Sequence, residues 1–103
     1  MSPNAKMMMV VLSKNDMRGE VALYEAIVRR LAQLEVRGAA VHVGEMGFGS
    51  HHKVHHKRLF GVSDDCPVTI MVVDGEERLR AVAPEVRKML PDGLIFMTDV
   101  EIL

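Results

Sequence analysis

Apolar and polar positions along the chain follow two different periods, which predict strands and helices in alternation. The run from Lys6 to Leu12 is almost wholly apolar and ends in a polar cluster, which is typical of a buried strand. Apolar positions then recur every three or four residues, at Leu23, Ile27, Leu31 and Leu34. This spacing predicts an amphipathic helix of about four turns that begins near Gly19 and ends near Gly38.

Three further segments follow this helix in the sequence. Residues 39–49 alternate apolar with polar side chains, as a half-buried strand does, and end in closely spaced glycines. Residues 50–66 have no sustained period and are predicted to form a loop. Pro67 to Asp74 is apolar almost throughout and rich in β-branched residues, which predicts a strand buried on both faces.

A second helix is predicted after this strand. Asp74 is followed three residues later by Glu77, which resembles a capping box at a helix start. Apolar residues then recur with helical spacing at Leu79, Val82, Val86 and Met89. Pro84 lies inside this pattern and predicts a kink or a division into two short helices, because proline removes one backbone hydrogen bond. The sequence Pro91-Asp92-Gly93 ends the helix.

Residues 94–103 supply a last strand, with an interruption expected near Thr98 and Asp99. The element order predicts an α+β class, ferredoxin-like βαββαβ sandwich in one domain of residues 1–103, with a four-stranded antiparallel sheet and two helices on one face. Two helices cover only one face of such a sheet, so an apolar second face predicts association with other copies of the chain. The alternative is that these side chains are few and lie flat on the surface.

Composition narrows the classes of function. The chain has 103 residues, of which 49% are hydrophobic and 26% charged, and its net charge of -1 gives no general attraction to nucleic acid. The longest apolar run, Met7 to Leu12, is far shorter than the ~20 residues of a membrane-spanning helix, and no leader peptide is expected. The single cysteine, Cys66, fits a reducing cytosol and is expected to be a small core residue.

Two segments have residue types suited to ligand binding. Glycines 44, 47 and 49 allow close approach of an anion to backbone N–H groups, although a tight turn or a bulge explains the same glycines. Residues 50–66 contain four of the five histidines, namely His51, His52, His55 and His56, next to Lys53, Lys57 and Arg58. This composition is consistent with a solvated polar loop, an anion-attracting patch or a metal site completed by a second chain. No constellation typical of catalysis is present, so the chain is predicted not to be an enzyme.

Several stretches together resemble the short PII-like signalling proteins, a family defined by domain of unknown function 190. The similarity is most specific in the sequence LYEAI at 23–27, in the Gly47-Phe48-Gly49 turn with histidines behind it, and in residues 67–74 followed by Glu76 and Glu77. It covers nearly the whole chain. The resemblance implies a ferredoxin-like fold, a trimer and a sensing role rather than turnover.

The resemblance also implies a ligand site between subunits. In PII proteins a Gly-Phe-Gly sequence begins the long effector loop beside an adenine nucleotide, so Gly47, Phe48 and Gly49 are expected to form the wall of that cleft. Asp92 and Gly93 resemble the phosphate loop that follows the second helix. AMP, ADP or ATP is the expected ligand class.

Two departures from PII proteins change this expectation. The loop after Gly49 is short and lacks the tyrosine that is modified in enteric PII proteins, and the chain ends at Leu103, before the arginine-bearing segment that holds phosphates there. The remaining candidate cations are Lys53, His55, His56, Arg58, Arg87 and Lys88. These groups suit a monophosphate or diphosphate better than a triphosphate. Phe96 and Thr98 also differ from the residue types expected in the last strand.

Partners follow from the same resemblance. Family members are often associated with ion-transport genes, including fluoride exporters, so a membrane transporter is the expected partner of a cytoplasmic regulator. The alternative function is a metal-binding trimer in which His51, His52, His55 and His56 of three chains surround a cation, as in metal-tolerance proteins of similar fold.

Overall fold

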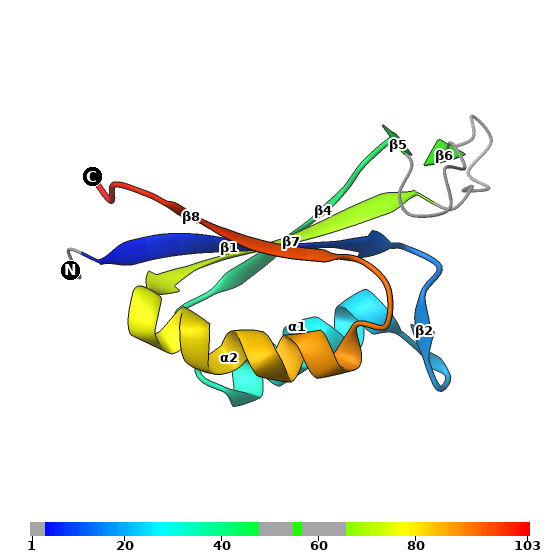
Figure 1. Cartoon of the computed structure of the whole chain (residues 1–103). Helices are drawn as coiled ribbons and strands as arrows, with labels where there is room; N and C mark the ends of the chain where they lie inside the picture. Colours follow the sequence, from blue (N-terminus) through cyan, green and yellow to red (C-terminus); the bar gives the residue numbers. More distant parts are fainter. Residues whose placement is uncertain (1–3, 48–54, 57–65) are drawn as a thin grey trace.

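The centre of the molecule is a four-stranded antiparallel sheet with strand order β4-β7-β1-β8. The computed structural model describes residues 4–47, 55–56 and 66–103. The four strands are β1 (Ala5–Ser13), β4 (Ala39–Val43), β7 (Pro67–Gly75) and β8 (Leu94–Asp99). Both helices, α1 (Leu23–Gln33) and α2 (Glu76–Met89), lie on the same face of the sheet (Figure 1). The predicted ferredoxin-like βαββαβ sandwich is therefore confirmed.

The two central strands present alternate side chains to the helices. In β1 the buried positions are Met8, Val10 and Leu12, and in β7 they are Val68, Ile70 and Val72. The register pairs Val10 with Ile70, so these side chains share one face. The prediction that residues 67–74 are buried on both faces is wrong for the single chain, because no described element covers the other face and its side chains are only half-buried.

The helices complete the core with the apolar positions that the spacing predicted. Buried residues are Leu23, Ile27 and Leu31 in α1 and Leu79, Val82 and Val86 in α2. Each fully buried aliphatic side chain stabilises the fold by about 1.5–3 kcal/mol. Cys66 is buried beside the start of β7 and is free of any disulfide, as expected for a core residue.

The ends of α1 differ from the prediction. Val21 and Ala22, which were expected in its first turn, instead form β3 (Val21–Ala22), which pairs with β2 (Met17–Arg18) in a short hairpin. Gly19, between these strands, has a left-handed conformation at φ 63°. At the other end the left-handed residue is Glu35, at φ 61°, and not Gly38. The helix is therefore shorter than expected, because hairpin pairing competes with helix formation before Leu23.

One prediction about α2 is wrong, and a second is wrong for one of its two alternatives. Asp74 does not cap the helix: its carboxylate oxygens accept hydrogen bonds from the N–H of Gly75 at 2.7 Å and from the N–H of Arg37 at 3.0 Å, and the N-cap is Gly75. Asp74 therefore ties the segment before β4 to the end of β7. Pro84 does not divide the helix, because it lies on the exposed side while apolar packing on the opposite side holds α2 together as one element.

The segment between β4 and β7 contains a second short pairing. The strand expected over residues 39–49 ends at Val43, and β5 (Met46–Gly47) pairs with β6 (His55–His56). The prediction of a loop over residues 50–66 is therefore wrong at β6, because His55 and His56 pair with the backbone of β5. Residues 48–54 and 57–65 lie outside the described residues. The last strand ends at Asp99, where the interruption was expected.

Candidate functional site

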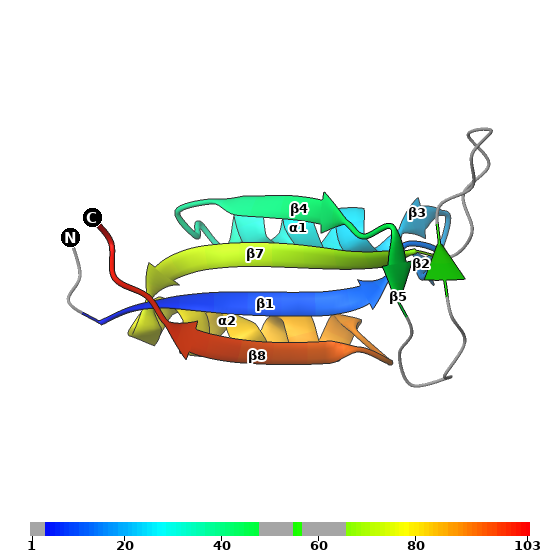
Figure 2. The same cartoon turned by 90° about the horizontal axis from the view of Figure 1, so that it is seen from above.

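Four strand ends meet at one end of the sheet. The register pairs Ser13, the last residue of β1, with Pro67, the first residue of β7, and it pairs Val43 of β4 with Val68. β8 begins at the same end, because Leu94 pairs with Val11. We call this region the glycine end, since it is where Gly44, Gly47 and Gly93 lie. Figure 2 shows β5 and β6 at this end of the molecule.

Gly44 fixes the exit of β4. Its N–H donates a hydrogen bond of 2.7 Å to the carbonyl oxygen of Pro67, and a Cβ at this position would come within 2.8 Å of Pro67 Cγ. A residue other than glycine would push β4 away from β7. The sequence pattern did not distinguish Gly44 from the other two glycines, whereas the structure shows that a side chain at Gly44 would clash with Pro67.

Gly47 lies in β5, where it pairs with His55 of β6. The structure therefore brings two predicted site residues together through their backbones, and His56 pairs with Met46 in the same ribbon. The other candidates in this segment lie outside the described residues: His51, His52, Lys53, Arg58, Phe48 and Gly49.

Gly93 has a steric role in the turn between α2 and β8. Its φ is 141°, and a Cβ would meet the carbonyl oxygen of Val11 at 2.7 Å and both methyl groups of Leu90 at 3.1 Å. Arg87 stiffens the same turn, since its guanidinium donates to the carbonyl oxygens of Leu90 and, at 3.5 Å, of Gly93. Asp92 is exposed. The close approach to β1 explains this glycine without a ligand.

The two glycine elements lie at opposite edges of the sheet. β4 and β8 are the outer strands, with β7 and β1 between them. Three strand spacings separate the outer strands by about 14 Å. Gly44, which directly follows β4, therefore belongs to one edge, and Asp92 and Gly93, which directly precede β8, belong to the other. Within one chain they do not meet around a single phosphate group.

The two cations expected from α2 already have local partners. Arg87 binds the turn carbonyls described above, and Lys88 Nζ lies 3.5 Å from Glu85 Oε2 on the same helix. The Lys88 side chain is 75% exposed, so this contact leaves it accessible. Arg87 is the better placed of the two beside the Asp92–Gly93 turn, because the turn itself orients its guanidinium.

The face of the sheet opposite the helices carries a continuous apolar surface, which we call the open face. Its apolar members are Met7, Met9, Val11, Met71, Val73, Leu94 and Phe96. The register places Met9 between Met71 and Phe96. Leu94 is 56% exposed and Phe96 42% exposed. Figure 2 shows the strands of this sheet lying in front of both helices. The predicted uncovered apolar face is thus present.

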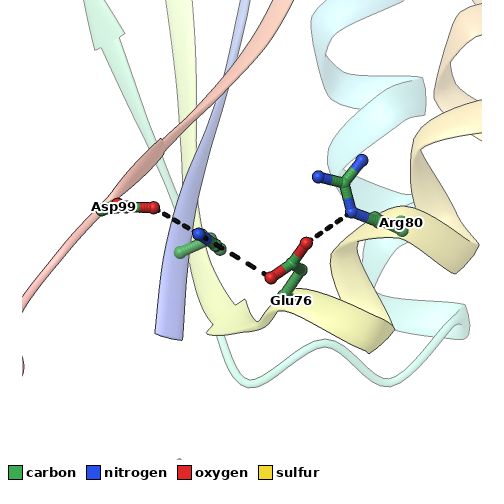
Figure 3. A network of polar contacts seen from close by, with 4 residues as sticks. Glu76, Arg80 and Asp99 are labelled. Carbon is green, nitrogen blue, oxygen red and sulfur yellow. Dashed lines mark hydrogen bonds and ion pairs between the residues drawn. The ribbon is translucent and has the colours of Figure 1, made fainter. Parts of the chain in front are cut away.

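The other end of the sheet is closed by a network of charges that the sequence analysis missed (Figure 3). Lys6 of β1 pairs with Asp99 of β8 and lies 3.7 Å from Glu76, and Arg80 donates to Glu76 at 2.7 Å. The hydrogen bond to Asp99 raises the pKa of Lys6 above its ordinary value. The hydrogen bond from Arg80 lowers the pKa of Glu76. Of these contacts, only the Glu76–Arg80 ion pair could have been predicted from the sequence, because the two residues have the i, i+4 spacing of neighbours on a helix.

The described part of the chain shows neither a cluster of metal-binding side chains nor a helix able to span a membrane. Its residues form no group of three or more His, Cys, Asp or Glu side chains able to hold a metal ion. The histidines of the metal hypothesis are either outside that part or described only by their backbone, so the hypothesis stays a prediction. Within residues 4–47, 55–56 and 66–103 no helix is long and apolar enough to cross a membrane.

Comparison with known proteins identifies relatives over nearly the full length. The model of the family DUF190, described as "Uncharacterized ACR, COG1993", matches residues 5–102. A UPF0166 protein of Methanocaldococcus jannaschii is 30% identical over 99 residues, which are 95% of this chain and 91% of the relative. A UPF0166 protein of Aquifex aeolicus is 24% identical over 98 residues, with 95% and 92% covered.

Solved structures show the same fold. CPII, a nitrogen regulatory PII-like protein from Thiomonas intermedia K12 solved with ADP, AMP and bicarbonate, superposes with a TM-score of 0.65 at 22% identity, over 95% of this chain and 87% of CPII. CPII solved with ADP and bicarbonate gives a TM-score of 0.64 at the same identity and coverage. The resemblance to short PII-like proteins is confirmed at the level of family and fold.

Proposed function

Since this chain belongs to the DUF190 family, we propose that it is a PII-like regulatory protein that binds an adenine nucleotide between copies of itself. The proposal extends to this chain what CPII, a protein of the same fold, was solved with. A nucleoside monophosphate or diphosphate, AMP or ADP, is the form we favour over ATP, because the candidate cations are few.

The observation that carries the proposal is the placement of the two glycine elements at the same end but on opposite edges of the sheet. In a closed ring each interface joins two different surfaces of the subunit. A ring of three copies that sets the β4 edge of one beside the β8 edge of the next would bring the segment that begins at Gly44 near Asp92 and Gly93 of the neighbouring copy. The ligand cleft then exists only in the assembly.

The open face supplies the driving force for this assembly. Burying an apolar surface contributes about 25 cal/mol per Å². Phe96 and Leu94 on β8 are half-exposed in the single chain and flank the more sheltered methionines of β1. A contiguous apolar surface of this kind marks an interaction site in a protein that is otherwise evenly charged. We therefore propose the trimer as the functional form.

Phosphate binding in this cleft would use cations from both edges. Arg87 lies at the Asp92–Gly93 turn, with its guanidinium aimed at the carbonyl oxygens of Leu90 and Gly93. From the other edge, the proposal assigns Lys53, His55, His56 and Arg58 to the phosphates and Phe48 and Gly49, beside Gly47, to the cleft wall. Charge-assisted bonds of this type contribute about 1.5–3 kcal/mol each. Three of them supply a large share of the roughly 8 kcal/mol that micromolar binding requires.

Titration calorimetry with AMP, ADP and ATP, each with and without bicarbonate, tests ligand binding, and sedimentation velocity tests the assembly. We expect AMP or ADP to bind and the protein to sediment as three copies. Gly47→Val is expected to weaken nucleotide binding. Gly38→Val is the matched control, because a Cβ at Gly38 has no atom within 4 Å. Unchanged affinity in Gly47→Val, with the fold intact, would remove this strand from the site.

We propose regulation rather than catalysis, with nucleotide binding changing the conformation of the chain between β5 and β7 and so its contact with a partner. A ligand shifts such an equilibrium only by its difference in affinity for the two conformations, and a tenfold effect needs about 1.4 kcal/mol. A cytoplasmic surface of a membrane transporter is the partner that we propose. Chromatography of ATP and ADP after incubation tests for turnover, and steady product formation would contradict the regulatory assignment.

A further inference from the structure

A groove of about 510 Å³ lies between the two helices, in a part of the molecule that the nucleotide proposal does not use. It runs along α1 from Ala26 to Gln33 and beside the last turns of α2, and the β2–β3 hairpin extends it. Figure 1 shows β2 beside this end of the two helices. The helix residues that line it follow helical spacing, at positions 26, 29, 30 and 33 of α1 and 85, 88 and 89 of α2.

The groove is strongly positive although the whole chain is slightly negative. Its lining contains the cations Arg18, Arg29, Arg30 and Lys88 and one carboxylate, Glu85. Four positive charges and one negative charge leave a net +3, against -1 for the chain. A groove lined mainly by charges of one sign attracts ligands of the opposite charge.

Arg30 uses its positive charge to join the two helices, whereas Arg18 and Arg29 remain available to bind a ligand. Arg30 donates to Glu85 at 3.0 Å across the two helices and to Gln33 at 3.1 Å, and the hydrogen bond from Arg30 lowers the pKa of Glu85. Arg29 is 73% exposed and pairs only with Glu25, on its own helix, within the described residues. The Arg18 side chain, at the hairpin, makes no hydrogen bond or ion pair with any described residue.

The floor of the groove is apolar. Val21 is 41% exposed although it is a large aliphatic residue, and Ala26 and Met89 beside it are half-buried. The register pairs Val21 with Arg18 across the hairpin, so the exposed Val21 side chain and a guanidinium with no partner among the described residues lie at the same end of the groove. An apolar floor with a basic rim is complementary to an amphipathic acidic ligand.

We propose that this groove binds an acidic, amphipathic segment of another protein, with an apolar side chain on the floor and carboxylates on the rim. Arg18 and Arg29 bind the carboxylates, and Val21, Ala26 and Met89 contact the apolar side chain. A nucleic acid fits less well, because the groove has no aromatic side chain on which a base stacks. A flat membrane reaches the rim but leaves the floor unfilled. The inference is independent of nucleotide binding, since none of the groove residues is one that the nucleotide proposal assigns to the ligand.

A fluorescein-labelled helical peptide of glutamates with leucines at every third or fourth position is the probe, measured by anisotropy. We expect binding that weakens with added salt and weakens about fivefold in Arg18→Glu and again in Arg29→Glu. Arg37→Glu is the matched control, because it reverses an exposed arginine that is not part of the groove. Arg18→Gln and Arg29→Gln repeat the test with a smaller charge change if a reversal impairs folding, and ADP titration of every variant keeps the nucleotide site separately measured.

Four outcomes would overturn the proposal. The first is no binding of the peptide by the unmodified protein. The second is an equal loss of binding in Arg37→Glu, which indicates attraction to overall charge. The third is equal binding of a control peptide in which serine replaces each leucine, since the floor then contributes nothing. The fourth is binding of phosphatidylserine vesicles or single-stranded DNA in place of the peptide, which assigns the groove to another class of partner.

Discussion

The two faces of the sheet are both apolar, but they are built from different side chains. The helix-covered face of the central strands is formed mainly by branched residues, such as Val10, Ile70 and Val72, which are fully buried. The open face places unbranched methionines in the equivalent rows, among them Met9 and Met71, and these are only half-buried. Branched side chains have few rotamers and pack tightly, whereas methionine adapts to the surface it meets. The first face specifies the fold, and the second is suited to contact with another molecule.

The largest expected effect comes from the covered face. Ile70→Ala should lower the free energy of unfolding by about 3 kcal/mol, because it leaves a cavity in a core that is closed on all sides. Met71→Ala, one residue later, removes a side chain of similar size from the open face and should cost less than half as much in the single chain. Urea unfolding at protein concentrations where the chain sediments as one copy measures both. Equal losses would mean that the faces do not differ as described.

The second prediction uses a charge on the open face. Met9→Asp should weaken association of copies by about a hundredfold, since a carboxylate in the middle of the apolar surface would be buried without a partner. Its effect on the unfolding of the single chain should be small, because Met9 points away from the helices. Sedimentation velocity is the measurement. Met17→Asp is the control, because Met17 is 57% exposed on the hairpin and lies off this face.

A third prediction concerns the turn at Gly93 before β8, which sets which β8 side chains face the helices and which lie on the open face. A slip of one residue would move Leu94 and Phe96 to the helix side, and Gly93 opposes such a slip because it fits against the Val11 carbonyl. Gly93→Ala should destabilise the chain by about 1–3 kcal/mol through its positive φ and this contact. Gly38→Ala should be neutral or slightly stabilising. Thermal unfolding of the two variants compares them, and similar melting temperatures would contradict the steric role.

The smallest expected effect is the pH dependence of the charge network formed by Lys6, Asp99, Glu76 and Arg80, at the end of the sheet opposite the glycine end. Arg80 lowers the pKa of Glu76 below 4.5, so the stability from this pair is present at neutral pH and is lost as the pH falls through the lowered pKa. Asp99 raises the pKa of Lys6 above 10.5, so that contribution is lost only as the pH rises through the raised pKa.

Melting temperatures of the wild type and of Glu76→Gln between neutral and acidic pH measure this contribution. The difference between the two proteins should shrink as the solution becomes acidic. Glu77→Gln is the control, since it removes the same charge one position away at a residue that forms no ion pair within the described part of the chain. A constant difference at every pH would mean that the pair does not contribute through its charge.

The fold could be predicted from the sequence because it depends on periodic patterns. The apolar residues from Leu23 to Leu34 are four or three positions apart, and this spacing predicted α1. The apolar runs at 6–12 and 67–74 predicted the central strands. The errors lie where local pairing competes with such a pattern. The β2–β3 hairpin took the residues expected in the first turn of α1, and Asp74 bonded to a distant backbone N–H instead of capping a helix.

The candidate site was less predictable for a geometric reason. The sequence indicated two glycine elements, but only the strand order shows that they lie at opposite edges, where one chain cannot join them. The groove between the helices left no signal either. Its central pair, Arg30 and Glu85, is 55 residues apart in sequence and meets only because α1 and α2 pack side by side. Contacts of that kind depend on helix packing, which residue spacing within either helix does not determine.

The methionines of the open face also make it a chemical reporter. Peroxide converts an accessible thioether to a polar sulfoxide, which no longer packs in an apolar contact. Met7, Met9 and Met71 are partly accessible in the isolated chain and would be shielded by any molecule that covers them. Their rate of oxidation would therefore record how much of the time this surface is covered. A cell under oxidative stress would damage newly made, still solitary chains before those already sheltered by a neighbour.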